Sequence, residues 1–442
     1  MSLKSPFTMY QLIDAKKRAE VLSTEAIHWM VNEYVAKRIP DYQAAALLMA
    51  IYCRGMNDQE TANLTDAMLH SGRMLNFNDR TVVDKHSTGG IGDKPSFILA
   101  PIAAACGVKV PMIAGRGLGF TGGTVDKVES VPGFRTNLTL DDFADQLKKH
   151  GIVLMGQTPE IAPADRLFYA LRDVTATIDC IPLITASIMS KKLAEGAEGI
   201  VFDIKHGSGA FMRDPKQARL LAKSLLKTGK RFKRRCMVML TDMSQPLGQE
   251  VGHALEIQES IRVLKGEGPA DLTYLSIELA AGMVLLAGKA KTMAEARNKC
   301  FKTIDDGSAL KKFRHMLALQ GGDASVVDHP QKLIVAREKT VIKSPKKGWL
   351  KSFQNDQIGY LLTELGGGRK TIEQTPDLAV GFTFHAKIGA KLNKGDALMT
   401  IHHHANQKEL VSAIEKRFLK EVVGFSTRAV RAPKLISEVL RG

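Results

Sequence analysis

Five short apolar runs that alternate with glycine-rich loops and helical patterns constrain the fold of this chain more than any other feature. They begin near Thr81 and read VVD (82–84), VKVPMIA (108–114), GIVLMG (151–156), GIVFDIK (199–205) and CMVMLTD (236–242). Short apolar runs bounded by turn residues are typical of strands that are buried on both faces. Their alternation with helices predicts a largely parallel α/β sheet.

Helical patterns dominate the segment before this alternation. The pattern from Met9 to about Gly72 is helical throughout, and the segment from Ala164 to Gly196 predicts two more helices. Beyond about Lys339 the chain becomes strand-like and rich in glycine. We therefore predict a helical domain that is split in the sequence, a large mixed α/β domain and a β-rich C-terminal α+β module. The expected ranges are 1–72 and 164–196 for the helical domain, 73–163 and 197–338 for the α/β domain, and 339–442 for the module.

Composition excludes several classes of protein. The longest apolar stretch, Phe97 to Val108, covers 12 residues, and a membrane helix needs about 20. The first residues contain no continuous apolar segment of the kind that directs export, so we expect a cytoplasmic protein with no membrane partner. The five cysteines are widely spaced and form no CxxC pair, which argues against a zinc site and a disulfide framework.

The net charge of +16 raises the question of a nucleic-acid partner. The densest basic run, KTGKRFKRR at 227–235, is isolated and holds a single aromatic residue. Single-strand binding surfaces interleave bases with several aromatic side chains. We interpret the run as solvated surface and expect no nucleic acid.

The loop after the first apolar run has the composition of an anion site. It contains three glycines between Lys85 and Ser96, where a helix begins. Glycines expose backbone N–H groups, a helix start favours negative charge, and Lys85, Ser87 and Ser96 add donors. A merely tight strand-to-helix turn would require neither the lysine nor the hydroxyl groups.

A second glycine-rich loop, GRGLGFTGGT at 115–124, formally contains GxGxxG at 117–122, with Asp141 about twenty residues later. This is the arrangement of a dinucleotide-binding turn. We consider that alternative weak because another anion loop precedes it and a helical domain opens the chain.

A third segment places a hydroxyl and an ammonium group on one helix face. Ser187 and Lys191 are four residues apart, and Arg172 lies upstream. Such a group can hold the carbonyl oxygens of a heterocycle and stabilise negative charge on it. A surface helix with ordinary lysines explains the spacing equally well.

Together these segments resemble the thymidine and pyrimidine-nucleoside phosphorylases. The matching motifs are DKHSTGGIGDKPS (84–96), GRGLGFTGGTVDKVES (115–130), PADRLFYALRDVTATIDCIPLITASIMSKKLAEG (163–196) and DIKHGSGAFM (203–212). The resemblance runs from about Met9 to the C-terminus. It implies a helical domain hinged to the α/β domain, and reversible phosphorolysis of pyrimidine nucleosides, foremost thymidine, to the free base and a pentose 1-phosphate.

The resemblance also implies roles for individual residues. The catalytic residues would be His86, Arg172 and Lys191. Phosphate would be bound by Lys85, Ser87, Ser96 and Thr124. The nucleoside would be bound by Arg172, Ser187, Lys191, Leu118, Ile184 and Phe211. No metal or other cofactor is expected, since phosphate itself is a substrate.

The resemblance further implies a homodimer formed through the helical domain, for which we expect an exposed apolar face containing Leu12, Ile27, Val31 and Leu47.

The chain departs from the family pattern at three positions. Ala114 stands where the family usually has a phosphate-site serine, Phe120 replaces a usual histidine, and His206 occupies a position that is more often small or apolar. Loss of one hydrogen bond to a charged ligand costs about 1.5 to 3 kcal/mol, so we expect a working enzyme with weakened phosphate binding or a shifted specificity.

Alternative functions remain open in the sequence. A broad uridine and thymidine phosphorylase, a nucleotide phosphorylase or an anthranilate phosphoribosyltransferase would share related folds, and a nucleoside-binding protein without turnover is a fourth alternative. His402 and His404 alternate along an expected strand, but nothing nearby completes a metal-ligand set.

Overall fold

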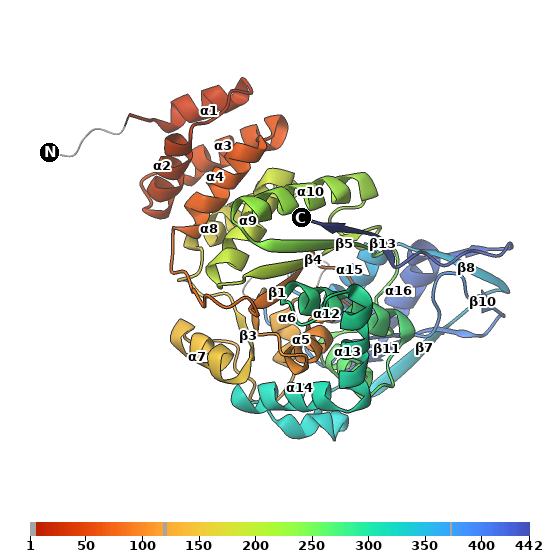
Figure 1. Cartoon of the computed structure of the whole chain (residues 1–442). Coiled ribbons are helices and arrows are strands. Elements are labelled where there is room, and N and C mark those ends of the chain that lie inside the picture. The colour runs from red at the N-terminus through yellow and green to blue at the C-terminus, as the bar shows by residue number, and fades with distance from the viewer. Residues whose placement is uncertain (1–5, 118–121, 372–373) are drawn as a thin grey trace.

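The computed structural model describes residues 6–117, 122–371 and 374–442. In Figure 1 the helical domain lies at one end of the molecule, the central sheet with its helices follows, and the C-terminal module, in blue, lies on the far side. Within the described ranges, no helix has both the length and the apolar composition that crossing a membrane requires.

The helical domain is assembled from two separate segments of the chain. Its helices are α1 (Met9–Lys17), α2 (Thr24–Val35), α3 (Asp41–Arg54), α4 (Asp58–Leu69), α8 (Pro163–Val174) and α9 (Ile181–Ala194). Side chains of Thr8, Ser23 and Asn57 accept backbone N–H groups at the starts of α1, α2 and α4, as N-cap residues do. Phe168 and Leu183 share one apolar core with α1 to α4, which joins the two segments.

The apolar face expected on this domain is not exposed. Leu12, Ile27, Val31 and Leu47 are all buried in the domain's own core. The expectation was wrong because an amphipathic pattern marks the face that packs against neighbours, and here those neighbours belong to the same chain. The large apolar side chains exposed on α1 and α3 are Tyr10, Tyr42, Met49 and Tyr52.

All five apolar runs form strands, and the predicted parallel sheet is confirmed. The strands are β1 (Val83–Ser87), β2 (Val110–Ala114), β3 (Ile152–Gly156), β4 (Gly199–His206) and β5 (Arg235–Asp242). β1, β4 and β5 pair in parallel, as do β2 and β3, and a parallel bridge from Val82 to Lys109 connects the two groups. The carboxyl ends of these strands, where α/β proteins bind ligands, therefore face one direction.

Helices cover both faces of this sheet. They are α5 (Ser96–Ala105), α6 (Thr124–Val128), α7 (Leu140–His150), α10 (Pro215–Arg231), α11 (His253–Leu264), α12 (Ala270–Leu286), α13 (Met293–Asp305) and α14 (Ser308–Leu319). Alternate residues of β4 enter different cores, Val201 that of α5 and α12, and Ile200 that of α9 and α10. Burial on both faces explains why these strands are apolar without alternation.

The C-terminal module contains small antiparallel sheets and two helices. Its elements are β7 (Glu338–Lys343), β8 (Gly348–Phe353), α15 (Asn355–Leu365), β9 (Gly381–Phe384), β10 (Lys391–Leu392), β11 (Ala397–His403), α16 (Lys408–Arg417) and β12 (Val423–Ser426). Two strands cross the boundary expected at 339: β6 (Glu250–Val251) pairs with β9, and the last strand β13 (Ile436–Arg441) pairs antiparallel with β5 of the central sheet.

Candidate active site

A cavity of about 550 Å³ lies where the helical domain meets the carboxyl ends of the parallel strands. Its walls come from the ends of β1 and β2, the loops that follow them, α8 and α9 of the helical domain, and the segment after β4. Every predicted site residue that the structure describes contributes to this lining. Leu118 lies outside the described residues.

Lys85 places a buried positive charge on the side of the cavity that we predicted to bind phosphate. It lies in the middle of β1, is 4 % exposed and lines the cavity. In the described part of the chain its ammonium group has no hydrogen-bond or ion-pair partner. Burial lowers the pKa of Lys85, although Asp93 and Asp203 oppose this change. A buried cation without a partner favours an anionic ligand.

Ser87, Ser96 and Thr124 bring hydroxyl groups to the same cavity. The Ser87 hydroxyl donates to Asp93 Oδ2 at 2.6 Å and accepts from the Gly89 N–H at 3.1 Å. Ser96 is the first residue of α5, and Thr124 opens α6. The start of α5 adds the favourable dipole end of a ten-residue helix. An oxyanion at this loop would meet the start of α5, whereas the Ser87 hydroxyl, which donates its proton to Asp93, would have to turn to reach the anion.

The side of the cavity that we predicted to bind the base is formed by α8 and α9. Lys191 Nζ contacts Asp165 and lies 2.9 Å from Ser187 Oγ. Arg172 is buried, and its guanidinium donates to the carbonyl oxygens of Thr177 at 3.2 Å, Ile178 at 2.5 Å and Leu183 at 3.2 Å. These bonds use three of the five N–H donors of an arginine and hold the group at the cavity wall.

His86 lies on β1, lines the same cavity and is held neutral. Burial is the largest cause of a pKa well below the ordinary value, and the charges of Lys192, Lys191 and Lys85 lower it further. A neutral imidazole donates from one ring nitrogen and accepts at the other. His86 can therefore orient a carbonyl or hydroxyl group of a substrate at neutral pH, but the free protein holds no imidazolium acid at this position.

Apolar residues complete the lining. Ile184, in the first turn of α9, and Phe211, after β4, both line the cavity, and Phe211 is 40 % exposed. Ala114 ends β2 and contributes its methyl group to the wall. His206 is not among the described residues that line the cavity, and its Nε2 lies 3.2 Å from Ser437 Oγ. Phe120 lies outside the described residues.

Sequence reasoning missed the carboxylates and the arginine that support these groups. Asp165 contacts Lys191, and Asp93 accepts from the Ser87 hydroxyl. Both carboxylates lie inside the motifs quoted above, so the sequence could have indicated them. Arg369, from the C-terminal module, lines the cavity and reaches the glycine-rich loop at the carbonyl oxygen of Gly117. No local pattern around Arg369 marks it.

The competing motifs have ordinary structural partners. In the glycine-rich loop at 115–124, the Gly117 N–H donates to Asp126 at 2.7 Å, and Asp126 also pairs with Arg369. His402 lies 2.8 Å from Thr383 Oγ1, and His404 2.6 Å from Asp377. Among the described residues, no group of three or more histidine, cysteine or acidic side chains is arranged to hold a metal ion.

Three family models match successive parts of the chain. Residues 79–310 match the model of the glycosyl transferase family α/β domain, and residues 10–72 match the helical bundle domain of that family. Residues 349–422 match the C-terminal domain of pyrimidine nucleoside phosphorylase.

Curated relatives match almost the whole chain. A pyrimidine-nucleoside phosphorylase of Geobacillus stearothermophilus is 47 % identical over 430 residues, which cover 97 % of this chain and 98 % of the relative. One from Staphylococcus aureus (strain bovine RF122 / ET3-1) is 44 % identical over 434 residues, which cover 98 % and 99 %. The crystal structure of anthranilate phosphoribosyltransferase from Thermus thermophilus has a TM-score of 0.59 at 20 % identity and covers 70 % of this chain and 99 % of that one, which shows a shared fold.

Proposed function

The chain belongs to the pyrimidine-nucleoside phosphorylases, which are pentosyl-transferring enzymes, and from this membership we propose that its cavity carries out phosphorolysis of pyrimidine nucleosides, foremost thymidine. The observation that carries the proposal is the buried ammonium group of Lys85 on the cavity wall, which has no hydrogen-bond or ion-pair partner among the described residues. An inorganic phosphate bound there by Ser87, Ser96 and Thr124 would neutralise it.

The reaction needs a nucleophile on one side of the sugar and a stabilised leaving group on the other. An oxygen of hydrogen phosphate bonds to the anomeric carbon while the glycosidic C–N bond breaks. The electron pair of that C–N bond passes to the base, and the proton of the hydrogen phosphate ends on the base nitrogen. Lys191 and Arg172 stabilise the negative charge that develops on the pyrimidine. The Ser187 hydroxyl and the neutral imidazole of His86 orient the ring. No metal or redox cofactor takes part in this proposal.

Exclusion of water is the second requirement, because water at the anomeric carbon would give hydrolysis. The cavity lies between the helical domain and the α/β domain, so a movement of one domain toward the other would close it. Closure would also bring the base held by α8 and α9 toward the phosphate held after β1.

The test is base release followed by ultraviolet absorbance, with thymidine, deoxyuridine and uridine each assayed with and without inorganic phosphate. We expect release only with phosphate, and the highest kcat/KM for thymidine. An equal kcat/KM for uridine would show a broad pyrimidine-nucleoside activity in place of a preference for thymidine. Release that is independent of phosphate, or no release from any of the three, would refute the proposal.

A pair of lysine variants tests the phosphate site. Lys85→Ala should raise the KM for phosphate about tenfold or more, because it removes a charged partner of the anion. Lys351→Ala is the control, since Lys351 is exposed on β8 and does not line the cavity. A wild-type phosphate KM in Lys85→Ala would show that phosphate binds elsewhere.

We further propose a homodimer that forms through the helical domain. Exposed apolar side chains on α1 and α3, Tyr10, Tyr42, Met49 and Tyr52, support this contact, since exposed apolar patches mark association sites. Light scattering after size-exclusion chromatography should give twice the 48.3 kDa of the chain. A monomer mass across the working concentration range would rule the dimer out.

A further inference from the structure

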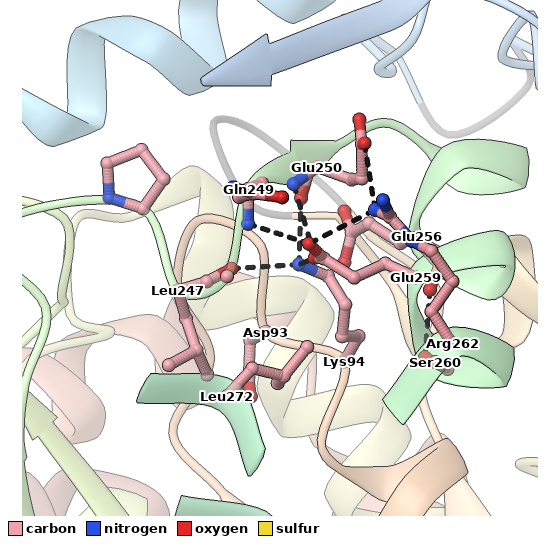
Figure 2. Close-up of polar contacts among 12 residues, drawn as sticks. Asp93, Lys94, Leu247, Gln249, Glu250, Glu256, Glu259, Ser260, Arg262 and Leu272 are labelled. Carbon is pink, nitrogen blue, oxygen red and sulfur yellow. Dashed lines mark hydrogen bonds and ion pairs between the residues drawn. The ribbon is translucent and has the colours of Figure 1, made fainter. Parts of the chain in front are cut away.

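A fully buried lysine ammonium lies in a cage of oxygen atoms beside the proposed phosphate loop (Figure 2). Lys94 Nζ donates to the carbonyl oxygens of Leu247 and Glu250, each at 2.8 Å, and to Glu259 Oε2 at 2.7 Å. The side chains of Lys94 and Glu259 are both 0 % exposed. An ammonium group has three N–H donors, so the cage satisfies all of them.

The cage is built around the charge rather than around the lysine stem. Gly92 and Gly248 adopt φ angles of +71° and +68°, and a Cβ on either would approach Lys94 Nζ to within 3.2 Å and 3.1 Å. Glu259 also accepts the backbone N–H groups of Gln249 at 2.8 Å and Glu250 at 3.1 Å. The segment 247–250 therefore wraps its carbonyl and N–H groups around one carboxylate and one cation.

The charge of Lys94 is maintained in this buried place. Burial alone would favour the neutral amine, but the carboxylates of Glu259 and Glu256 more than compensate and raise the pKa of Lys94 above its ordinary value. Glu256 is itself paired with Lys127 at 2.8 Å, and Glu250 with Arg262 at 3.0 Å. Lys94 is paired directly with Glu259 at 2.7 Å, and Arg262 lies 3.5 Å from the other oxygen of that carboxylate.

Lys94 stands at the end of the loop that carries the proposed phosphate donors. Its neighbour Asp93 accepts from the Ser87 hydroxyl, and Ser96 begins α5 two residues later. On the same loop, the carbonyl of Ile91 accepts the Leu247 N–H at 3.1 Å. The ammonium group therefore ties the 87–96 loop to the 247–250 segment and, through Glu259, to α11.

A second lysine contacts the same segment from the side of the C-terminal module. Lys387 Nζ donates to the carbonyl oxygens of Pro246 and Gly248 and forms an ion pair with Asp271 at 3.1 Å. These partners differ from those of Lys94, and none of them belongs to the 87–96 loop. Lys387 thus provides a matched comparison for Lys94.

We propose that the Lys94 ammonium acts as a tethered monovalent cation that positions the phosphate-binding loop. Lys94 is a positioning residue, since it does not line the cavity. Removal of its side chain leaves an oxygen cage whose size and charge suit a free ammonium ion, or potassium, which has a similar radius. The native protein needs no such added ion because its own side chain fills the cage.

The test is chemical rescue of Lys94→Ala. We expect its phosphate KM to rise about tenfold or more, because small displacements of positioning groups have effects of that size, while the nucleoside KM changes little. Ammonium chloride, and more weakly potassium chloride, should restore the phosphate KM at constant ionic strength, and sodium or choline chloride should not. Wild-type activity should not respond to any of these salts.

Two variants distinguish loss of the cation from a general loosening of the protein around the 247–250 segment. Lys94→Met fills the space without a charge, so it should lose phosphate affinity and resist rescue. Lys387→Ala removes an ammonium group from the other side of the segment and should keep the wild-type phosphate KM. An ammonium-dependent increase in the Tm of Lys94→Ala reports cage occupancy without reference to phosphate. If Lys94→Ala folds only in ammonium buffer, that dependence supports the same conclusion.

The inference rests on the proposed phosphate site, and the outcomes distinguish the two. A wild-type phosphate KM in Lys94→Ala, or a raised KM that neither ammonium nor potassium lowers, would overturn the positioning role. A salt-dependent Tm together with an unresponsive phosphate KM would overturn it as well. Failure of the phosphate site itself would appear as a wild-type phosphate KM in Lys85→Ala, whatever the salt does to Lys94→Ala.

Discussion

Substitution of Arg369 by methionine tests whether the C-terminal module supports the active site. Arg369 lies in the turn after α15, and its two terminal nitrogens each donate to Asp126 at 2.7 Å. The side chains are 10 % and 1 % exposed. Asp126 also accepts the Gly117 N–H, so this pair connects the module to the glycine-rich loop that precedes Thr124.

The expected loss of stability follows from the partners that Asp126 retains. Breaking a buried ion pair by removing one partner costs about 3 to 5 kcal/mol. Asp126 would keep the Gly117 N–H at 2.7 Å and Arg116 at 3.0 Å, but the Arg116 side chain is 52 % exposed. We therefore expect a loss of about 2 to 3 kcal/mol, below the full penalty.

The assay is denaturant-induced unfolding combined with steady-state kinetics. Arg417→Met is the matched control, because Arg417 pairs with Glu364 in the same module while the two side chains are 37 % and 34 % exposed. Such an exposed pair contributes about 0 to 1 kcal/mol. Arg369→Met should also raise the phosphate KM, since the glycine-rich loop loses its anchor. Equal stability losses in the two variants, or an unchanged phosphate KM in Arg369→Met, would refute this reasoning.

Three further substitutions probe single groups. Ala114→Ser adds a donor to the cavity wall and should lower the phosphate KM about tenfold; an unchanged KM would contradict the role given to this position. His86→Asn should lower kcat about tenfold through a lost hydrogen bond, while the acid limb of the pH profile of kcat/KM stays where it is. If the variant lacks an acid limb that the wild type shows near pH 6.5, an imidazolium acts at this position. Burial opposes ionisation of Asp79, but bonds from Thr81 and Lys109 hold its pKa at about 2. Because this pKa is depressed, the ionised Asp79 should stabilise the fold above about pH 4, and this stabilisation should be lost toward pH 2. Asp79→Asn should therefore lower the free energy of unfolding by about 1 kcal/mol at pH 7 after solvent screening. Urea unfolding at pH 7 and pH 2.5 measures the loss, and an equal loss at both pH values would contradict the expectation.

The central fold could be predicted because its signal is local. Each of the five apolar runs became a strand, since a strand that is buried on both faces must be apolar over its whole length. The second of the two helices predicted over 164–196 could likewise be recognised from Pro182 near its start. The predicted donors Lys85, Ser87 and Ser96 meet because they surround one strand end.

What could not be predicted depends on contacts between distant segments. Arg369 is more than two hundred residues from Asp126, and no periodicity around either residue specifies the partner. The last strand, β13, pairs with β5 rather than within its own module, because an edge of the central sheet was open to it. The prediction of an exposed apolar face on the helical domain was wrong for a similar reason. Only the packed structure shows that α8 and α9 share the apolar core of α1 to α4.

Several lysines are buried near the cavity, but their pairing with carboxylates leaves one lysine charge for the side that we propose binds phosphate. Lys94, Lys127, Lys192 and Lys205 are all buried, and each is paired with a carboxylate, those of Glu259, Glu256, Asp84 and Asp203. Paired charges of this kind fix loops and strands but offer little net attraction to a ligand. Within the described residues Lys85 is the buried lysine on the cavity wall that lacks such a carboxylate. The paired lysines therefore hold the frame, and we expect Lys85, which lacks such a pair among the described residues, to attract the anion. Ser87→Asp would add a carboxylate two residues from Lys85 on β1 and should abolish phosphate binding and base release, whereas retention of phosphate binding would place the anion elsewhere.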